Sequence, residues 1–121
     1  MNSSRIARFV RCWFAEWEAE PIRYGRASHV LHYLIEQRPE EAWVRILALV
    51  AQAKAESLDL VAAGPLEDLL YWHGRAMLER VEVAAFADAR FASCLSGVWG
   101  HTRFEPFVYA QVQRIIHSSK A

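Results

Sequence analysis

The sequence predicts an all-α fold, built as a single compact domain of about seven or eight helices that covers residues 1–121. Apolar residues recur at spacings of three and four through most of the chain, and no run keeps the alternation of a strand. The 121 residues are 54% hydrophobic, which suffices to bury one core without disulfides or metals. Glycine and proline fall mainly between the periodic segments, where they mark short turns.

The first half of the chain is expected to form three helices. Ser3 or Ser4 can cap the first one, because a serine oxygen accepts hydrogen bonds from the free N–H groups of the first turn, and Pro21 ends it. Ser28 lies near the start of the second helix. Pro39 fits the first turn of the third, and the acids that follow it favour the positive end of the helix dipole. The second and third helices are expected over about 27–37 and 39–55.

The second half is expected to form five shorter helices. Ser57 and Asp88 are candidate caps, and Gly64 and Gly74 are predicted to end two of the helices. Pro65 fits the first turn of the helix between these glycines. The expected ranges are about 57–63, 65–73, 75–87, 88–97 and 105–117. Helix pairs of this length resemble the stacked hairpins of HEAT-like repeat proteins, although no sequence repeat is visible.

The charge balance argues against nucleic acid as a partner. The formal net charge is zero, from 14 basic and 14 acidic residues, whereas a dedicated nucleic-acid binder needs a basic footprint. The charge is unevenly spread, because residues 39–74 carry six acids and two bases. An acidic middle favours a basic partner surface, and ordinary solvated helix faces are the simpler interpretation.

The cysteines and the apolar runs bear on the compartment. Cys12 and Cys94 lie far apart and outside any CxxC motif, so a single disulfide is conceivable and a pair of reduced core thiols is expected. No signal peptide is visible, and no run of 18 apolar residues predicts a membrane span. We therefore expect a cytoplasmic protein with no membrane partner.

The segment GPLEDLLYWHG, residues 64–74, allows a chemical and a structural interpretation. Glu67 and Asp68 precede His73 by six and five positions, and a helix places neither acid on the face of that histidine. The structural interpretation explains more of the segment, because the acids would stabilise a helix start between two glycines. Tyr71, Trp72 and His73 cannot all point inward, so a large aromatic side chain is expected on the surface as a contact site.

Other motifs do not assemble a catalytic or metal site. His29 and His32 are one helical turn apart, but no third ligand is near and HExxH is absent. GxSxG, GxxxxGK[ST] and GxGxxG are also absent, and apolar neighbours would leave Cys94 inert. We therefore expect no metal, no cofactor and no enzyme activity. Trp72 and Trp99 lie at expected helix ends, where a tryptophan can form an interface, and Arg103 is spaced to stack on Trp99.

Three segments together carry a family resemblance: RPEEAW at 38–43, GPLEDLLxxHG at 64–74 and FxxxLxxVWG at 91–100. The chain resembles a family of small uncharacterised bacterial helical proteins that share the GPLEDLL core and the downstream VW. The resemblance covers about residues 38–100 and implies no established activity. Proteins of this size and type resemble orphan accessory proteins, including immunity proteins that neutralise a toxin encoded beside them.

Three functional hypotheses follow. The first is a non-enzymatic protein-binding domain, most concretely a bacterial immunity protein that binds a cognate toxin. The second is a small enzyme or ligand-binding protein with an acid/histidine pocket, and the third is a structural adaptor or homodimer. For the first hypothesis the expected contact residues are Glu40, Glu41, Asp59, Glu67, Asp68, Tyr71 and Trp72. For the second the expected pocket residues are Glu67, Asp68, His73, Trp99 and Arg103.

Overall fold

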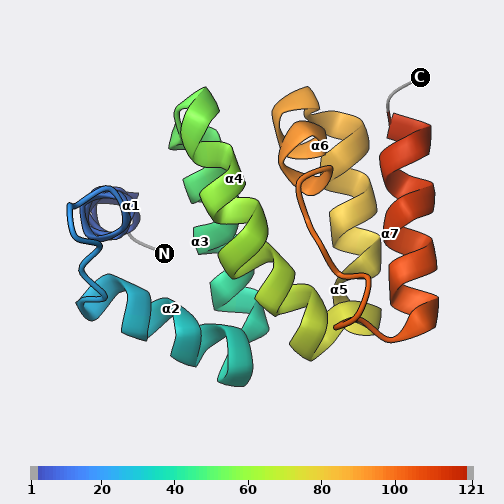
Figure 1. Cartoon of the computed structure of the whole chain (residues 1–121), viewed down its shortest axis with the longest axis horizontal. Helices are drawn as coiled ribbons and strands as arrows, with labels where there is room; N and C mark the ends of the chain where they lie inside the picture. The colour runs from blue at the N-terminus through green and yellow to red at the C-terminus, as the bar shows by residue number, and fades with distance from the viewer. Residues whose placement is uncertain (1–2, 120–121) are drawn as a thin grey trace.

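The computed structural model of the protein describes residues 3–119, and every regular element in that range is a helix (Figure 1). Residues 1–2 and 120–121 of the expected domain lie outside the described residues. The prediction of an all-α fold is confirmed. The α-helices are α1 (Ser3–Trp17), α2 (Arg26–Gln37), α3 (Pro39–Gln52), α4 (Leu58–Val61), α5 (Glu67–Ala87), α6 (Ala89–Leu95) and α7 (Pro106–Ser119). The two other elements are the 3-10 turn η1 (Ala55–Ser57) and the π-helical turn η2 (Ala62–Leu66).

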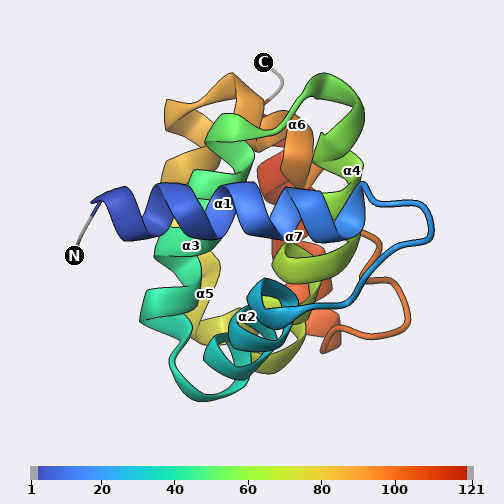
Figure 2. The same cartoon turned by 90° about the vertical axis from the view of Figure 1, so that its left-hand side faces the viewer.

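The helices are arranged along one long axis, with α1 near one end of it and α7 at the other (Figure 1). At one end α1 packs against α2 and α3, and it crosses α3 at a steep angle (Figure 2). At the other end α7 packs against α5 and α6. The consecutive helices α2 and α3 are in contact, as are α5 and α6, and the long α4–η2–α5 run connects the two ends of the molecule.

A single apolar core runs through these helices. Its fully buried side chains come from the helical stripes of the sequence, including Ile46 on α3, Leu69 on α5 and Ile115 on α7. Trp13 and Trp43 are buried, and Trp43 packs edge-to-face on Phe91. Within residues 3–119 the structure contains no helix with the length and apolar character to cross a membrane.

The helices expected over 57–63 and 65–73 form one run through α4, η2 and the first part of α5, so the helices number fewer than predicted, and a kink at His73 separates this run from the helix expected over 75–87. Gly64 does not end a helix, because no glycine in the described part of the chain has a positive φ. Pro65 does not begin a helix either, because it lies inside the π-helical turn. Proline has no N–H to donate, and a wider π-helical turn accommodates it without a break in the chain's helical course.

A second irregularity marks the middle of α5. His73 has φ −136° and ψ 30°, outside the helical region, and its Nε2 lies 2.7 Å from the carbonyl oxygen of Ile35 and 3.2 Å from that of Glu36. The imidazole N–H therefore donates to the carboxyl end of α2. Gly74 follows directly, so the chain bends at the boundary predicted between the helices 65–73 and 75–87, although Gly74 does not have the positive φ typical of a glycine that ends a helix. A Cβ at Gly74 would lie 2.7 Å from Cγ1 of Val108, so the missing side chain lets α5 approach α7.

The helix starts agree with the sequence in two places and differ in two. Pro39 occupies the first turn of α3, and the Asp88 carboxylate accepts a hydrogen bond from the Arg90 N–H at 2.9 Å as the cap of α6. Ser57 does not cap α4, because its hydroxyl donates to Glu18 Oε2 at 2.9 Å. The start of α2 is capped from outside its own sequence by Glu16 of α1.

The two cysteines are free and differ in environment. Cys94 is buried, as expected, and burial raises the pKa of its thiol to about 12, with a further contribution from the charge of Asp59. Cys12 is exposed on α1, so the expectation of two core thiols is wrong for this residue. The polar face of α1 explains the error, since Cys12 lies beside the stripe that contains Val10 and Trp13.

Candidate functional site

The two acids of the GPLEDLL segment pair with an arginine from a distant loop. The Glu67 side chain is buried, and its oxygens accept hydrogen bonds from the Trp99 backbone N–H at 3.0 Å and from Arg103 Nη1 at 2.7 Å. The same Nη1 lies 3.1 Å from Asp68 Oδ1. The hydrogen bond to Glu67, followed by that to Asp68, raises the pKa of the Arg103 guanidinium. Glu67 and Asp68 do not stabilise a free helix start, because the π-helical turn precedes them. They instead bind residues of the loop before α7.

Arg103 also contacts an exposed aromatic side chain. Its guanidinium carbon lies 4.7 Å from the centroid of the Tyr71 ring, within the range of a cation–π contact. Tyr71 in turn meets Trp72 edge-to-face, with ring centroids 5.6 Å apart. Tyr71 is 48% exposed and Trp72 is 49% exposed. The predicted surface aromatic is therefore present as a pair. Arg103 stacks on Tyr71, whereas the sequence predicted that it stacks on Trp99.

A second arginine–aromatic contact lies one turn further along α5. The Arg75 guanidinium carbon is 4.5 Å from the centroid of the Phe107 ring, and Arg75 Nε donates to Glu105 at 2.9 and 3.0 Å. Phe107 is 46% exposed at the start of α7. The two arginine–aromatic contacts involve neighbouring parts of the chain, because Tyr71 and Arg75 both belong to α5 and Arg103 lies in the loop that leads into α7. We call this set the aromatic–arginine surface: Tyr71, Trp72, Arg75, Arg103 and Phe107.

The other predicted partner-binding acids lie elsewhere. Glu40 pairs with Arg80 at 2.7 Å, and Glu41 lies 3.7 Å from Arg38, both in the first turn of α3. Asp59 is an exposed residue of α4. The structure thus brings Glu67, Asp68, Tyr71 and Trp72 together and places the other three predicted contact residues on different elements.

The residues of the alternative acid/histidine pocket do not all meet. Glu67, Asp68 and Arg103 form the cluster described above, whereas His73 donates to the carboxyl end of α2. The Trp99 side chain is 81% exposed, although its backbone N–H is held by Glu67. The cavity that Trp99 lines is formed with Val98, His101 and residues of α7, and His73 does not line it.

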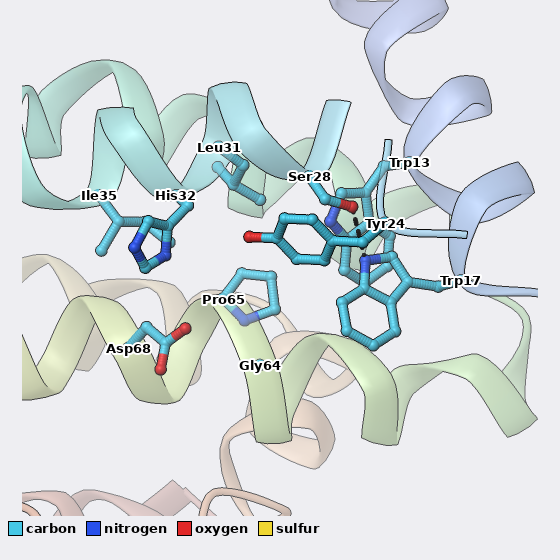
Figure 3. A pocket seen from close by; sticks show the side chains of 10 residues that line it. All are labelled: Trp13, Trp17, Tyr24, Ser28, Leu31, His32, Ile35, Gly64, Pro65 and Asp68. Carbon is cyan, nitrogen blue, oxygen red and sulfur yellow. Dashed lines mark hydrogen bonds between the residues drawn. The ribbon is translucent and has the colours of Figure 1, made fainter. Parts of the chain in front are cut away.

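A different pocket opens beside the π-helical turn (Figure 3). It has a volume of about 150 Å³. Gly64 and Pro65 of η2 form one side, and the aromatic residues Trp13, Trp17 and Tyr24 form another. A Cβ built on Gly64 would meet no atom within 4 Å, so this glycine borders open space. Single π-helical turns often occur at functional sites, which makes this pocket a candidate.

The polar groups of this pocket are few and mostly bonded already. Trp17 Nε1 donates to Ser28 Oγ at 2.9 Å, which leaves its ring to line the pocket. Asp68 and His32 point toward one another from the α5 and α2 sides (Figure 3). Burial raises the pKa of the Tyr24 hydroxyl, and the negative charges of Asp68 and Glu16 raise it further.

Reasoning from the sequence missed this pocket because its walls come from α1, the loop before α2, α2 itself and the π-helical turn. Trp13 and Trp17 have the helical spacing that is typical of a core stripe, and Tyr24 lies outside any helix. The one available signal was the Gly64–Pro65 pair inside a helical pattern, since such a pair can widen a helix as well as end it.

The histidines that resembled a metal pair are engaged separately. His29 Nδ1 donates to the Gly25 carbonyl at 2.8 Å, and His32 Nε2 lies 2.8 Å from Glu36 Oε2. Across residues 3–119 no group of three or more histidine, cysteine, aspartate or glutamate side chains is arranged to hold a metal ion.

The fold and these sites define a small all-α domain with an exposed aromatic face and a mainly apolar pocket beside the π-helical turn. The chain belongs to the family of unknown function DUF6869, whose model matches residues 16–119. The match extends well beyond the 38–100 range expected from the shared motifs. No curated protein sequence and no solved structure matches the chain, so HEAT-like stacking stays a prediction.

Proposed function

We propose that this chain is a non-enzymatic protein-binding domain that contacts its partner through the aromatic–arginine surface. The observation that supports the proposal is the grouping of three half-exposed rings, Tyr71, Trp72 and Phe107, with two arginines. Tyrosine, tryptophan and arginine contribute most to binding at protein interfaces. A partner that covers these rings would bury apolar area that folding of the chain alone leaves in water.

The arginines of this surface are already held in place before a partner arrives. Glu67 and Asp68 bind Arg103, and Glu105 binds Arg75. Fixing a long side chain costs conformational entropy at the moment of binding, and a side chain held beforehand avoids part of that cost. The ion pairs therefore support a role for this face in recognition.

In its concrete form the proposal is a cytoplasmic immunity protein that neutralises a cognate bacterial toxin by direct binding. The small size of the chain and the acid-rich segment 39–74 support this form, because negative charge can steer a basic toxin into contact. Glu40 and Glu41 are paired with arginines, so we assign most of the contact energy to the aromatic–arginine surface and only long-range attraction to the acids.

The test is capture of the tagged full-length chain from its native cells, with Trp72→Ala and Phe86→Ala as matched variants. Phe86 is 55% exposed on the same helix but lies outside the aromatic–arginine surface, so it controls for loss of an exposed ring. We expect a stoichiometric partner that Trp72→Ala loses and Phe86→Ala keeps. A partner retained equally by both variants contradicts the proposal.

If the partner is a toxin, its expression alone should arrest growth, and co-expression of the unsubstituted chain should restore it. Trp72→Ala should fail to restore growth although the variant protein accumulates with an unchanged melting temperature. A large drop in melting temperature with binding intact would instead make Trp72 a structural residue.

A second copy of the chain is the alternative occupant of this surface, as in the adaptor or homodimer hypothesis. Light scattering of the purified chain gives its molar mass directly. A dimer that Trp72→Ala converts to a monomer would assign the surface to self-association, whereas a monomer in both cases leaves it for a different protein.

A further inference from the structure

The pocket beside the π-helical turn combines aromatic walls with a negative charge. Trp13, Trp17 and Tyr24 surround one side of it, and Asp68 is the one carboxylate among the described residues that line it. That lining contains no lysine or arginine. Aromatic ring faces attract cations, and the attraction grows when the cation leaves water. The lining therefore suits a positively charged group better than a neutral or negative one.

The charge at the pocket is not fully neutralised by the protein. Arg103 pairs with two carboxylates. Its Nη1 lies 2.7 Å from Glu67 Oε2 and 3.1 Å from Asp68 Oδ1. One guanidinium pairs with two carboxylates, so the formal charge of the three side chains together is −1. Asp68 is the member of the cluster that lines the pocket, so the remaining negative charge lies at its edge.

The size and polarity of the pocket narrow the class of cation. A cavity of about 150 Å³ is comparable to one that accepts benzene. Its walls are mainly apolar, and the Trp17 indole N–H is already bonded to Ser28. An unsubstituted ammonium group would lose its hydration with few acceptors to replace it, whereas an alkylated ammonium group is weakly hydrated and fills aromatic walls.

We propose that this pocket binds an alkylated ammonium group, carried either by a small molecule or by a methylated lysine side chain. Asp68 supplies the compensating charge, the rings of Trp17 and Tyr24 contact the alkyl groups, and Gly64 leaves the space they occupy. The site adjoins the aromatic–arginine surface through the Asp68–Arg103 ion pair, but none of its lining residues belongs to that surface and it needs no protein partner, so each proposal can fail without the other.

The test titrates the full-length chain with choline and, in parallel, with 3,3-dimethylbutan-1-ol. The alcohol has the shape of choline with carbon in place of the charged nitrogen. The indole N–H signals of Trp13 and Trp17 report on the pocket by NMR. We expect saturable choline shifts at these two signals and about tenfold weaker binding of the alcohol, the loss expected when the cation contribution is removed. Equal affinity for both, or no shift with choline, overturns the proposal.

Two variants locate the binding. Asp68→Asn removes the charge and keeps the shape, and should weaken choline binding about tenfold. Gly64→Leu places a side chain into the open space and should abolish binding without unfolding the chain. Ala63→Leu is the matched control, because it adds the same side chain at an exposed position of the same turn. Choline binding that survives Gly64→Leu, or that is equally lost in Ala63→Leu, contradicts the assignment.

A peptide with trimethyl-lysine distinguishes the two sources of the group. Tighter binding of this peptide than of choline assigns the pocket to a modified protein, and the reverse order assigns it to a small molecule. Trp72→Ala should leave choline affinity unchanged, which separates this site from the proposed protein interface.

Discussion

Glu16 Oε1 accepts both the backbone N–H of Ser28, at 2.9 Å, and its hydroxyl, at 2.6 Å. The second oxygen of the same carboxylate accepts the Ala27 N–H at 2.9 Å. A side chain near the end of α1 thereby satisfies the free donors at the start of α2, a task that a residue just before the helix usually performs. The contact fixes the approach of α1 to α2 beside the candidate pocket.

Replacement of this carboxylate should destabilise the fold in a pH-dependent way. Glu16→Gln is expected to lower the free energy of unfolding at pH 7 by about 1 kcal/mol, the usual value of a helix cap. Burial acts to raise the pKa of Glu16, but its hydrogen bonds with Ser28, Ala27 and Gly25 outweigh burial and bring it below 4.5. The stabilisation by the charged form is therefore complete above about pH 5 and disappears as the pH falls through the folded-state pKa.

Urea unfolding of the two proteins at pH 7 and pH 3 checks this expectation. The gap between wild type and Glu16→Gln should narrow at the lower pH. A gap of equal size at both values would mean that the carboxylate charge contributes nothing and that only the shape of the side chain matters.

The same substitution at two glycines of one helical run should have opposite signs. Gly64→Ala adds a methyl group where no atom lies within 4 Å, and it should raise stability by about 0.5–1 kcal/mol because alanine loses less backbone entropy in a helix. Gly74→Ala would place its Cβ 2.7 Å from Val108 Cγ1 and should lower stability by about 1–3 kcal/mol through overpacking. Thermal unfolding of both variants measures the difference, and a shift of the same sign in both would contradict the assigned packing.

Loss of Arg103 should lower the free energy of unfolding, because the Glu67 carboxylate is buried and Arg103 is its cation. Arg103→Met keeps the aliphatic stem over Tyr71 but leaves Glu67 without its cation, and should destabilise by about 1–3 kcal/mol. The double variant Glu67→Gln/Arg103→Met removes both charges and should recover part of this loss. Denaturant unfolding of the single and double variants measures the coupling, and strictly additive effects would show that the two side chains act independently.

The two thiols should react at very different rates. Burial, with the charge of Asp59, raises the pKa of Cys94 to about 12, so almost none of it is thiolate at pH 8, whereas Cys12 is exposed. We expect Ellman's reagent at pH 8 to titrate one thiol in the folded protein and two in guanidinium chloride. Cys12→Ser should then leave no fast-reacting thiol, and a fast-reacting thiol in that variant would place Cys94 within reach of solvent.

Local signals in the sequence predicted much of the secondary structure. Pro39 and Asp88 mark the starts of α3 and α6 because each acts on its own first turn, and the apolar stripes that contain Ile46, Leu69 and Ile115 are core. Signals of this kind depend on neighbouring residues only. They are therefore readable without knowledge of how the helices pack.

The failures share a different cause, which is competition from residues distant in the chain. Ser57 does not cap its helix because Glu18 accepts its hydroxyl hydrogen bond. Glu67 is not a helix-start acid because Trp99 and Arg103 approach it from a loop about thirty residues away. The exposed Tyr71–Trp72 pair could be expected from crowding within α5 alone, whereas the aromatic pocket required the packing of α1 against α2.

The π-helical turn η2 also sets the rotational phase of the helical residues that follow it, up to the kink at His73. One residue more or less in a helix turns all later side chains by about 100° around the axis. With the phase as it stands, Glu67 faces the interior and Tyr71 and Trp72 face water. Loss of a single residue within Ala62–Leu66 would rotate Glu67, Asp68 and Tyr71 away from the groups that they contact in the two candidate sites. The length of this turn therefore fixes the directions in which the side chains between Glu67 and Trp72 point.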